Sequence, residues 1–123
     1  MKTIFNVILV LFFIIIISIS IWFSLDKNTR CKFIYGINIC NFYAMLDIAS
    51  NNPSISNFGK MMSLCGEMEN VPKKDSCFEI IAETFTNIDS NKAKEACSEI
   101  QDINDEAGNI VHKKEDCYNK ITK

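Results

Sequence analysis

The sequence contains little of what most catalytic sites require. It has one histidine, four glycines and two prolines among 123 residues. So few glycines leave no glycine-rich phosphate loop. A catalytic arrangement based on histidine would have to use His112, which lies beside Lys113 and Lys114 in a polar stretch typical of an exposed surface. We therefore expect no catalytic residue, and we expect that the protein is not an enzyme.

Metal and redox motifs are also absent. The cysteines include no closely spaced pair of the zinc type and no Cys-x-x-Cys redox motif. The acidic residues Asp102, Asp105 and Glu106 lack the order and the closing glutamate of a calcium loop. Glu79 and Glu83 are four residues apart, as on the wet face of a helix. We expect neither a metal site nor a cofactor.

The overall charge is mildly negative. Thirteen lysines and arginines are balanced by fifteen aspartates and glutamates, which gives a formal net charge of −2. Binding to nucleic acid requires clustered positive charge that neutralises phosphates. We therefore expect no nucleic-acid partner.

One long apolar run stands out in this otherwise ordinary composition. Residues Ile4 to Leu25 include no charged side chain. As a helix the run would be roughly 33 Å long, enough to cross a hydrocarbon core of about 30 Å. Trp22 lies near its downstream end, where an aromatic ring is favoured at the membrane interface. The run predicts a transmembrane helix that contacts the lipid bilayer from Ile4 to Leu25.

The run could be an anchor or a cleaved signal peptide. Lys2 provides a short positive region, and Ser18-Ile19-Ser20 is a small-x-small pattern that a signal peptidase could use. Cleavage there would cut the apolar run in its middle, which favours an uncleaved anchor. Lys27, Arg30 and Lys32 follow the run and slightly favour a cytoplasmic domain. The cysteines instead favour an oxidising compartment, so we expect the carboxyl-terminal domain outside the cytoplasm.

Six cysteines follow the apolar run and allow fifteen pairings. They are Cys31, Cys40, Cys65, Cys77, Cys97 and Cys117. Pairing of consecutive cysteines places each midpoint beside a turn residue, at Tyr35-Gly36, Val71-Pro72 and Ala107-Gly108. Two antiparallel arms folded about such a turn bring equidistant residues level with each other. The pattern favours three structural disulfides between consecutive cysteines, with buried free thiols and metal or redox chemistry as alternatives.

Apolar residues at helical spacing predict that the rest of the chain is helical. Helices are expected over Asn38 to Ser50, along the face from Phe58 to Met68, and after Pro72 as far as Phe85. A further helix is expected with Ser90 as its cap and an apolar stripe from Ala93 to Ile103, and a last one from about Ile110. Between the apolar run and these helices, the residues Phe33, Tyr35, Ile37 and Ile39 alternate around Gly36, which predicts a small stapled loop or hairpin from Cys31 to Cys40. We expect this segment to pack as a collar on the helix that begins at Asn38, and contact with the membrane surface is the alternative.

Two segments recur along the chain. Lys60–Met68 aligns with Lys92–Ile100, and Lys73–Ile81 aligns with Lys113–Ile121 around the pattern Lys-Lys-acid-x-Cys-aromatic-x-x-Ile. The first of these hairpins contains Leu64-Cys65-x-x-Met68, a short turn, and then Lys74-Asp75-x-Cys77-Phe78-x-x-Ile81. In this pattern it resembles a group of small, uncharacterised, membrane-anchored archaeal proteins with cysteine-stapled helical hairpins. That resemblance covers about half the chain and implies a helical-hairpin fold and an anchor. It brings no known activity and no functional residue.

The sequence thus predicts an all-α protein with three parts. Residues 1–25 are expected to form the transmembrane anchor, 26–53 a juxtamembrane stapled loop and helix, and 54–123 two cysteine-bearing helical hairpins. The expected role is a single-pass membrane protein that presents an extracytoplasmic helical interaction domain to a protein partner at the cell envelope. A secreted disulfide-rich protein after signal cleavage is the alternative, and an envelope thiol-redox protein is a distant one.

Overall fold

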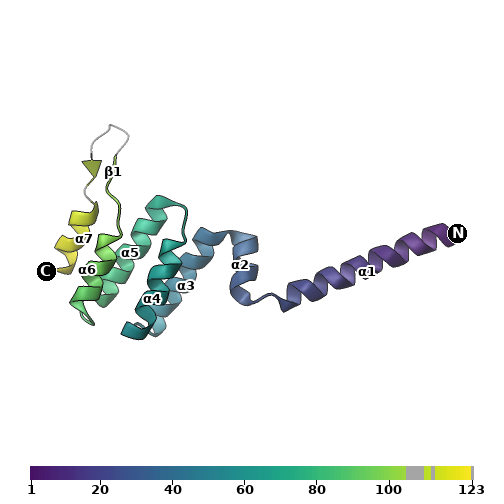
Figure 1. Cartoon of the computed structure of the whole chain (residues 1–123), viewed down its shortest axis with the longest axis horizontal. Coiled ribbons are helices and arrows are strands. Elements are labelled where there is room, and N and C mark those ends of the chain that lie inside the picture. The colour runs from purple at the N-terminus through teal and green to yellow at the C-terminus, as the bar shows by residue number, and fades with distance from the viewer. Residues whose placement is uncertain (105–109, 112, 123) are drawn as a thin grey trace.

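The computed structural model describes residues 1–104, 110, 111 and 113–122. Within these residues seven helices form, and the only strands are two short segments, β1 (Ile103–Asn104) and β2 (Ile110–Val111), which pair antiparallel. The predicted all-helical class is therefore confirmed. Figure 1 shows helix α1 projecting from one end of a helical domain, with the C-terminus at the opposite end.

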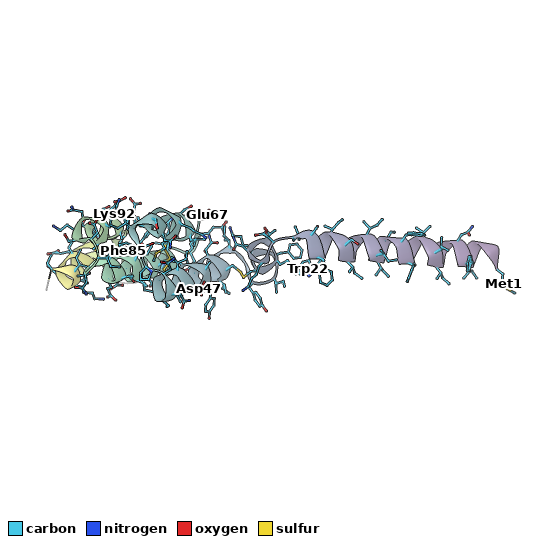
Figure 2. The ribbon with its side chains drawn as sticks, turned by 90° about the horizontal axis from the view of Figure 1, so that it is seen from below. Met1, Trp22, Asp47, Glu67, Phe85 and Lys92 are labelled. Carbon is cyan, nitrogen blue, oxygen red and sulfur yellow. A yellow bond between two sulfur atoms is a disulfide. The ribbon has the colours of Figure 1, made fainter. Side chains whose placement is uncertain are left out.

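Helix α1 (Lys2–Ser24) lies outside the core of the domain. Its segment Ile4–Ser24 is long and apolar enough to cross a membrane, and none of that stretch is buried. Its side chains project outward all along the helix (Figure 2). The Ser18 and Ser20 hydroxyls donate to the carbonyls of Ile14 and Ile16 at 2.8 and 2.9 Å, so these polar groups are satisfied within the helix. Such a helix is either a membrane span or a signal sequence.

Two helices meet at a corner directly after α1. Helix α2 (Lys27–Tyr35) begins at Asp26, whose side chain accepts a hydrogen bond from the backbone N–H of Thr29 at 3.2 Å. Gly36 separates α2 from α3 (Ile37–Asn51) with a φ of 82°, a conformation that L side chains rarely adopt. Figure 1 shows α2 lying across the axis of α1. The prediction of an alternating loop over Cys31 to Cys40 is wrong, because capping at Asp26 and the turn at Gly36 allow helix on both sides of the glycine.

Four further helices complete the domain. They are α4 (Ile55–Gly66), α5 (Val71–Phe85), α6 (Ser90–Ser98) and α7 (Lys113–Ile121). The Asn70 side chain caps α5 by accepting from the N–H of Lys73 at 3.0 Å. Asp89 caps α6, one residue earlier than the predicted Ser90, because its carboxylate accepts from two backbone N–H groups. A carboxylate is favoured there by the positive end of the helix.

Helix α6 ends at Ser98, and Ile103, predicted to lie on its apolar stripe, belongs to β1 instead. The last helix begins three residues later than predicted. Ile110 and Val111 belong to β2 and pair with Asn104 and Ile103. β-branched residues such as isoleucine and valine favour extended backbone. Helix α7 then starts at Lys113, and the carboxylate of Asp102 accepts from the N–H of Lys114 at 3.2 Å.

One hydrophobic core extends through the domain from α3 to α7. Its centre is the edge-to-face contact of Phe58 on α4 with Phe85 on α5, at 5.0 Å between ring centroids. Phe85 is fully buried and lies inside the domain in Figure 2. Four cysteines belong to the same core: Cys65, Cys77, Cys97 and Cys117.

Three disulfides join the cysteines in consecutive pairs, as the turn midpoints predict. The bonds are Cys31–Cys40, Cys65–Cys77 and Cys97–Cys117, with Cα atoms 5.8, 5.6 and 5.7 Å apart. Each bond joins one helix to the next helix along the chain, so the domain consists of three disulfide-linked helix pairs: α2–α3, α4–α5 and α6–α7. The first of these pairs includes a helix that the sequence did not predict.

Side chains from one helix pair hold the turn of the next. The Oδ1 atom of Asn38 on α3 accepts from the backbone N–H groups of Glu69 and Asn70, at 2.7 and 3.1 Å. The Oδ1 atom of Asp75 on α5 accepts from the N–H of Gln101 at 3.2 Å. These bonds join α3 to the turn before α5, and α5 to the segment after α6. Helix α3 is in contact with α5, and α5 is in contact with α7.

Candidate interaction surface

Helices α3, α5 and α7 form a row, and two clefts lie along it. The proximal cleft, nearer to α1, lies between α3 and α5 and has a volume of about 520 Å³. The distal cleft lies between α5 and α7 and has a volume of about 430 Å³. Ser76 on α5 lines both clefts, so they form one continuous surface.

The proximal cleft is mainly apolar. Asn38, Ile39, Phe42 and Tyr43 line it from α3, and Pro72, Lys73 and Ser76 line it from α5. Tyr43 is 67% exposed and Ile39 is 39% exposed, so the apolar lining is open to solvent. Ile39 and Tyr43 are four residues apart and therefore lie on one face of α3. This cleft offers an apolar contact surface beside the positive charge of Lys73.

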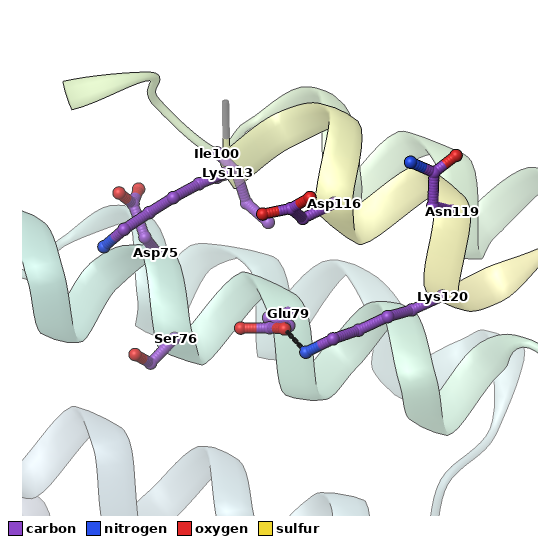
Figure 3. Close-up of a pocket in the computed structure, with 8 residues that line it drawn as sticks. All are labelled: Asp75, Ser76, Glu79, Ile100, Lys113, Asp116, Asn119 and Lys120. Carbon is purple, nitrogen blue, oxygen red and sulfur yellow. Dashed lines mark hydrogen bonds and ion pairs between the residues drawn. The ribbon is translucent and has the colours of Figure 1, made fainter. Parts of the chain in front are cut away.

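The distal cleft carries charges of both signs. It is lined by Asp75, Ser76 and Glu79 on α5, by Ile100, and by Lys113, Asp116, Asn119 and Lys120 on α7 (Figure 3). The Lys120 ammonium pairs with Glu79 and lies 3.7 Å from Glu83. The hydrogen bond to Glu79, followed by the negative charges of Glu79 and Glu83, raises the pKa of Lys120. Glu79 and Glu83, predicted as a solvated pair of carboxylates, thus connect α5 to α7.

Asp75 lines the distal cleft from α5. Its side chain is buried, at 3% exposure. One carboxylate oxygen accepts from Gln101, while Oδ2 has no hydrogen-bond partner among the described residues. A buried polar atom without a partner is uncommon in folded proteins. Sequence reasoning treated Asp75 only as part of a repeated pattern, because its burial depends on how α6 and the following turn pack over α5.

The predicted chemical residues do not gather into one centre. The six cysteines are all in disulfides. Asp102 caps α7, whereas His112, Asp105 and Glu106 lie outside the described residues. In the part of the chain that the structure describes, no three His, Cys, Asp or Glu side chains lie close enough together to hold a metal ion. The Ser76 hydroxyl donates to the carbonyl of Pro72 at 2.9 Å, which is a local helix contact and not an activated nucleophile.

Sequence reasoning missed both clefts. The residues that form them are far apart in the chain, and only the packing of α3 against α5 and of α5 against α7 brings them together. The available signal in the sequence was Tyr43, an aromatic residue outside the apolar stripe of its helix.

Comparisons of the chain with protein-family models, with curated proteins and with solved structures found no match. The function must therefore be argued from the chain itself.

Proposed function

We propose that this protein is a single-pass membrane protein whose uncleaved α1 anchors a helical domain outside the cytoplasm, and that the α3–α5–α7 row binds a protein partner. The observation that carries the binding proposal is the meeting of the apolar proximal cleft and the charged distal cleft at Ser76. A surface with an apolar part and a charged part fits a protein segment better than it fits a small metabolite.

The compartment is inferred from the disulfides. Structural disulfides persist in oxidising environments and are rare in the cytosol. Cys65, Cys77 and Cys97 are fully buried within one core, where a disulfide stabilises the domain by restricting the unfolded chain. Both points support a domain that folds after export.

The expected partner segment follows from the lining. An aliphatic or aromatic side chain of the partner would bury Ile39, Phe42 and Tyr43 in the proximal cleft, and an adjacent acidic residue would face Lys73. Polar or charged residues further along the segment would face Lys113 and Asp116 in the distal cleft. Apolar anchors in such clefts generally provide most of the binding energy, whereas charges at the rim provide orientation.

The anchor and the compartment are tested together by the intact mass of the native protein after free thiols are blocked without reduction. A full-length mass with no blocked thiol is the expected result. A mass shortened near Ser20 would instead indicate a secreted protein released by signal cleavage. Six blocked thiols at full length would contradict the extracytoplasmic placement, and two blocked thiols that exchange under mild oxidants would favour the thiol-redox alternative.

The binding surface is tested by a photo-crosslinking amino acid at position 43 in the native membrane. A crosslinked product is expected from this position and not from Ile88, an exposed position between α5 and α6. The product should disappear when Ile39→Asp is added, because the charge blocks apolar contact in the proximal cleft while leaving the domain folded. Equal crosslinking from positions 43 and 88, or a product unaffected by Ile39→Asp, would contradict the proposal.

A further inference from the structure

The junction between α1 and the domain is a defined corner. Helix α2 lies across the end of α1 in Figure 1 and is seen close to end-on in Figure 2. Only Leu25 and Asp26 separate the two helices. The Trp22 ring at the end of α1 meets the Phe33 ring of α2 edge-to-face, with centroids 5.8 Å apart. If α1 crosses a bilayer, α2 therefore lies along the surface of that bilayer.

Helix α2 exposes three consecutive large apolar residues. Phe33 is 80% exposed, Ile34 56% and Tyr35 62%. Soluble surfaces rarely display such a run, and where they do it marks an interaction site. Within the described residues no side chain of α2 is fully buried, so this helix contributes little to the core of the domain.

The composition of α2 matches the interface of a membrane. Lys27 and Arg30 lie on the same helix as the exposed apolar run, and tryptophan, tyrosine, lysine and arginine are the residues enriched at that depth. Their positive charges complement anionic lipid headgroups. Trp22 sits in the adjoining turn of α1, so the aromatic residues are continuous from the span to α2.

Several contacts hold α2 in this position. Arg30 Nε donates to the carbonyl of Leu25 at 2.9 Å, across the corner. The Cys31–Cys40 disulfide joins α2 to α3, and Lys32 pairs with Glu67 beyond α4 at 3.1 Å. The helix is thus fixed to both the anchor and the domain, and its orientation is defined relative to each.

We infer that α2 is an interfacial helix that rests in the headgroup region of the same bilayer that α1 crosses, with Phe33, Ile34 and Tyr35 at the acyl boundary. The inference depends on the proposed membrane anchorage, because the bilayer is the occupant of this apolar surface. Its consequence is that the domain is held at a set height above the membrane, with the proximal cleft close to the lipid surface.

The test uses the full chain in vesicles that contain phosphatidylcholine and phosphatidylglycerol brominated on their acyl chains. The chain has one tryptophan, so native Trp22 reports on anchoring. In a Trp22→Phe background, Phe33→Trp and Tyr35→Trp report on α2, and Ile88→Trp is the matched control on a distant exposed loop. We expect bromine to quench Phe33→Trp and Tyr35→Trp at least about twofold more than Ile88→Trp, because interfacial residues lie ~5–10 Å into the headgroup and acyl boundary.

The outcomes separate the inference from the proposed function. Quenching of native Trp22 without quenching of either α2 tryptophan would overturn the interfacial helix and leave the anchor intact. Absence of quenching at Trp22 itself would overturn the anchor and the inference together. The α2 tryptophans could instead be unquenched, with an emission that changes with protein concentration. That result would show that the apolar run contacts other copies of this chain, which also overturns the inference. Two independent α2 positions keep the test decisive if one variant fails to fold.

Discussion

Asn38 and Asp75 occupy corresponding positions in successive helix pairs. Asn38 lies two residues before Cys40 and accepts a hydrogen bond from the N–H of Glu69, four residues after Cys65. Asp75 lies two residues before Cys77 and accepts from the N–H of Gln101, four residues after Cys97. The acceptor residues thus connect neighbouring pairs through main-chain groups, independently of the disulfides inside each pair. In the third pair the corresponding residue is Glu115, which is exposed.

This relationship predicts that Asp75 acts as an acceptor and that its charge is dispensable. Asp75→Ala is expected to lower the free energy of unfolding by about 1–2 kcal/mol, because the Gln101 N–H loses its partner. Asp75→Asn keeps the acceptor, as Asn38 does, and should cost less than half as much. Urea unfolding of both variants measures the difference. An equal loss from Asn and Ala would show that the negative charge is what matters, and exposed Asp116→Asn in the same cleft is the control.

The contact of Glu67 with Lys32 and Asn41 predicts a dependence of stability on pH. The hydrogen bond from Lys32, followed by that from Asn41, holds the pKa of Glu67 below its ordinary value of 4.5. A lowered folded-state pKa gives a stabilising contribution that is present above the unfolded value and is lost as pH falls through the folded value. The difference in unfolding free energy between wild type and Glu67→Gln should therefore be constant near neutral pH and shrink below about pH 4.5.

The control for this pH dependence is the partner cation. In a Lys32→Gln background, Glu67→Gln should change the urea midpoint less, and the change should depend less on acid. If the difference in unfolding free energy between wild type and Glu67→Gln grew as the pH fell, the conclusion that the Glu67 pKa is lowered would be contradicted.

Removal of single disulfides should have unequal effects. The Cys65→Ser/Cys77→Ser double variant removes a fully buried bond from the shared core, and a loss of about 2–4 kcal/mol in global stability is expected. The Cys31→Ser/Cys40→Ser double variant should mainly accelerate hydrogen exchange in α2, because no α2 side chain is fully buried. Exchange measured by mass spectrometry locates each effect. A global loss of equal size from both double variants would contradict this assignment.

The ring pair in the core should show direct coupling. Phe58 and Phe85 meet edge-to-face at 5.0 Å, and a double-mutant cycle with leucine at both positions should give a coupling energy of about 0.5–1.5 kcal/mol. Phe85→Ala alone is expected to cost about 3–5 kcal/mol, because the residue is fully buried. Exposed Ile88→Ala is the control and should change stability by less than about 0.5 kcal/mol. Additive effects of the two leucine substitutions would show that the rings do not interact directly.

Much of the fold could be predicted because its signals are local. The apolar spacing in Phe58–Met68 and in the segment before Phe85 corresponds to buried faces of α4 and α5. The disulfide pairing followed from turn residues between consecutive cysteines, since an antiparallel helix pair brings such cysteines level. The uninterrupted apolar run gave α1 directly.

The errors have physical causes in particular residues. Helix α2 was missed because its formation depends on the Asp26 cap, the Gly36 turn and the Cys31–Cys40 bond more than on an apolar stripe. The start of α7 was misplaced because the backbone of Ile110 and Val111 pairs with β1, which is a contact between residues that are not adjacent in the chain. The clefts could not be predicted at all, because they require Tyr43, Ser76 and Asp116 to be neighbours across three helices.

The order of the disulfides along the chain has a consequence for biogenesis. The bonds close separations of 9, 12 and 20 residues, and none of them encloses or crosses another. If the domain is exported behind α1 as proposed, its cysteines would emerge in partner order, so the second cysteine of each pair could oxidise with the first before the next cysteine emerged. Formation of the native disulfides would then need an oxidant during translocation but no isomerase afterwards. The order in which the cysteines emerge would itself select the native pairs.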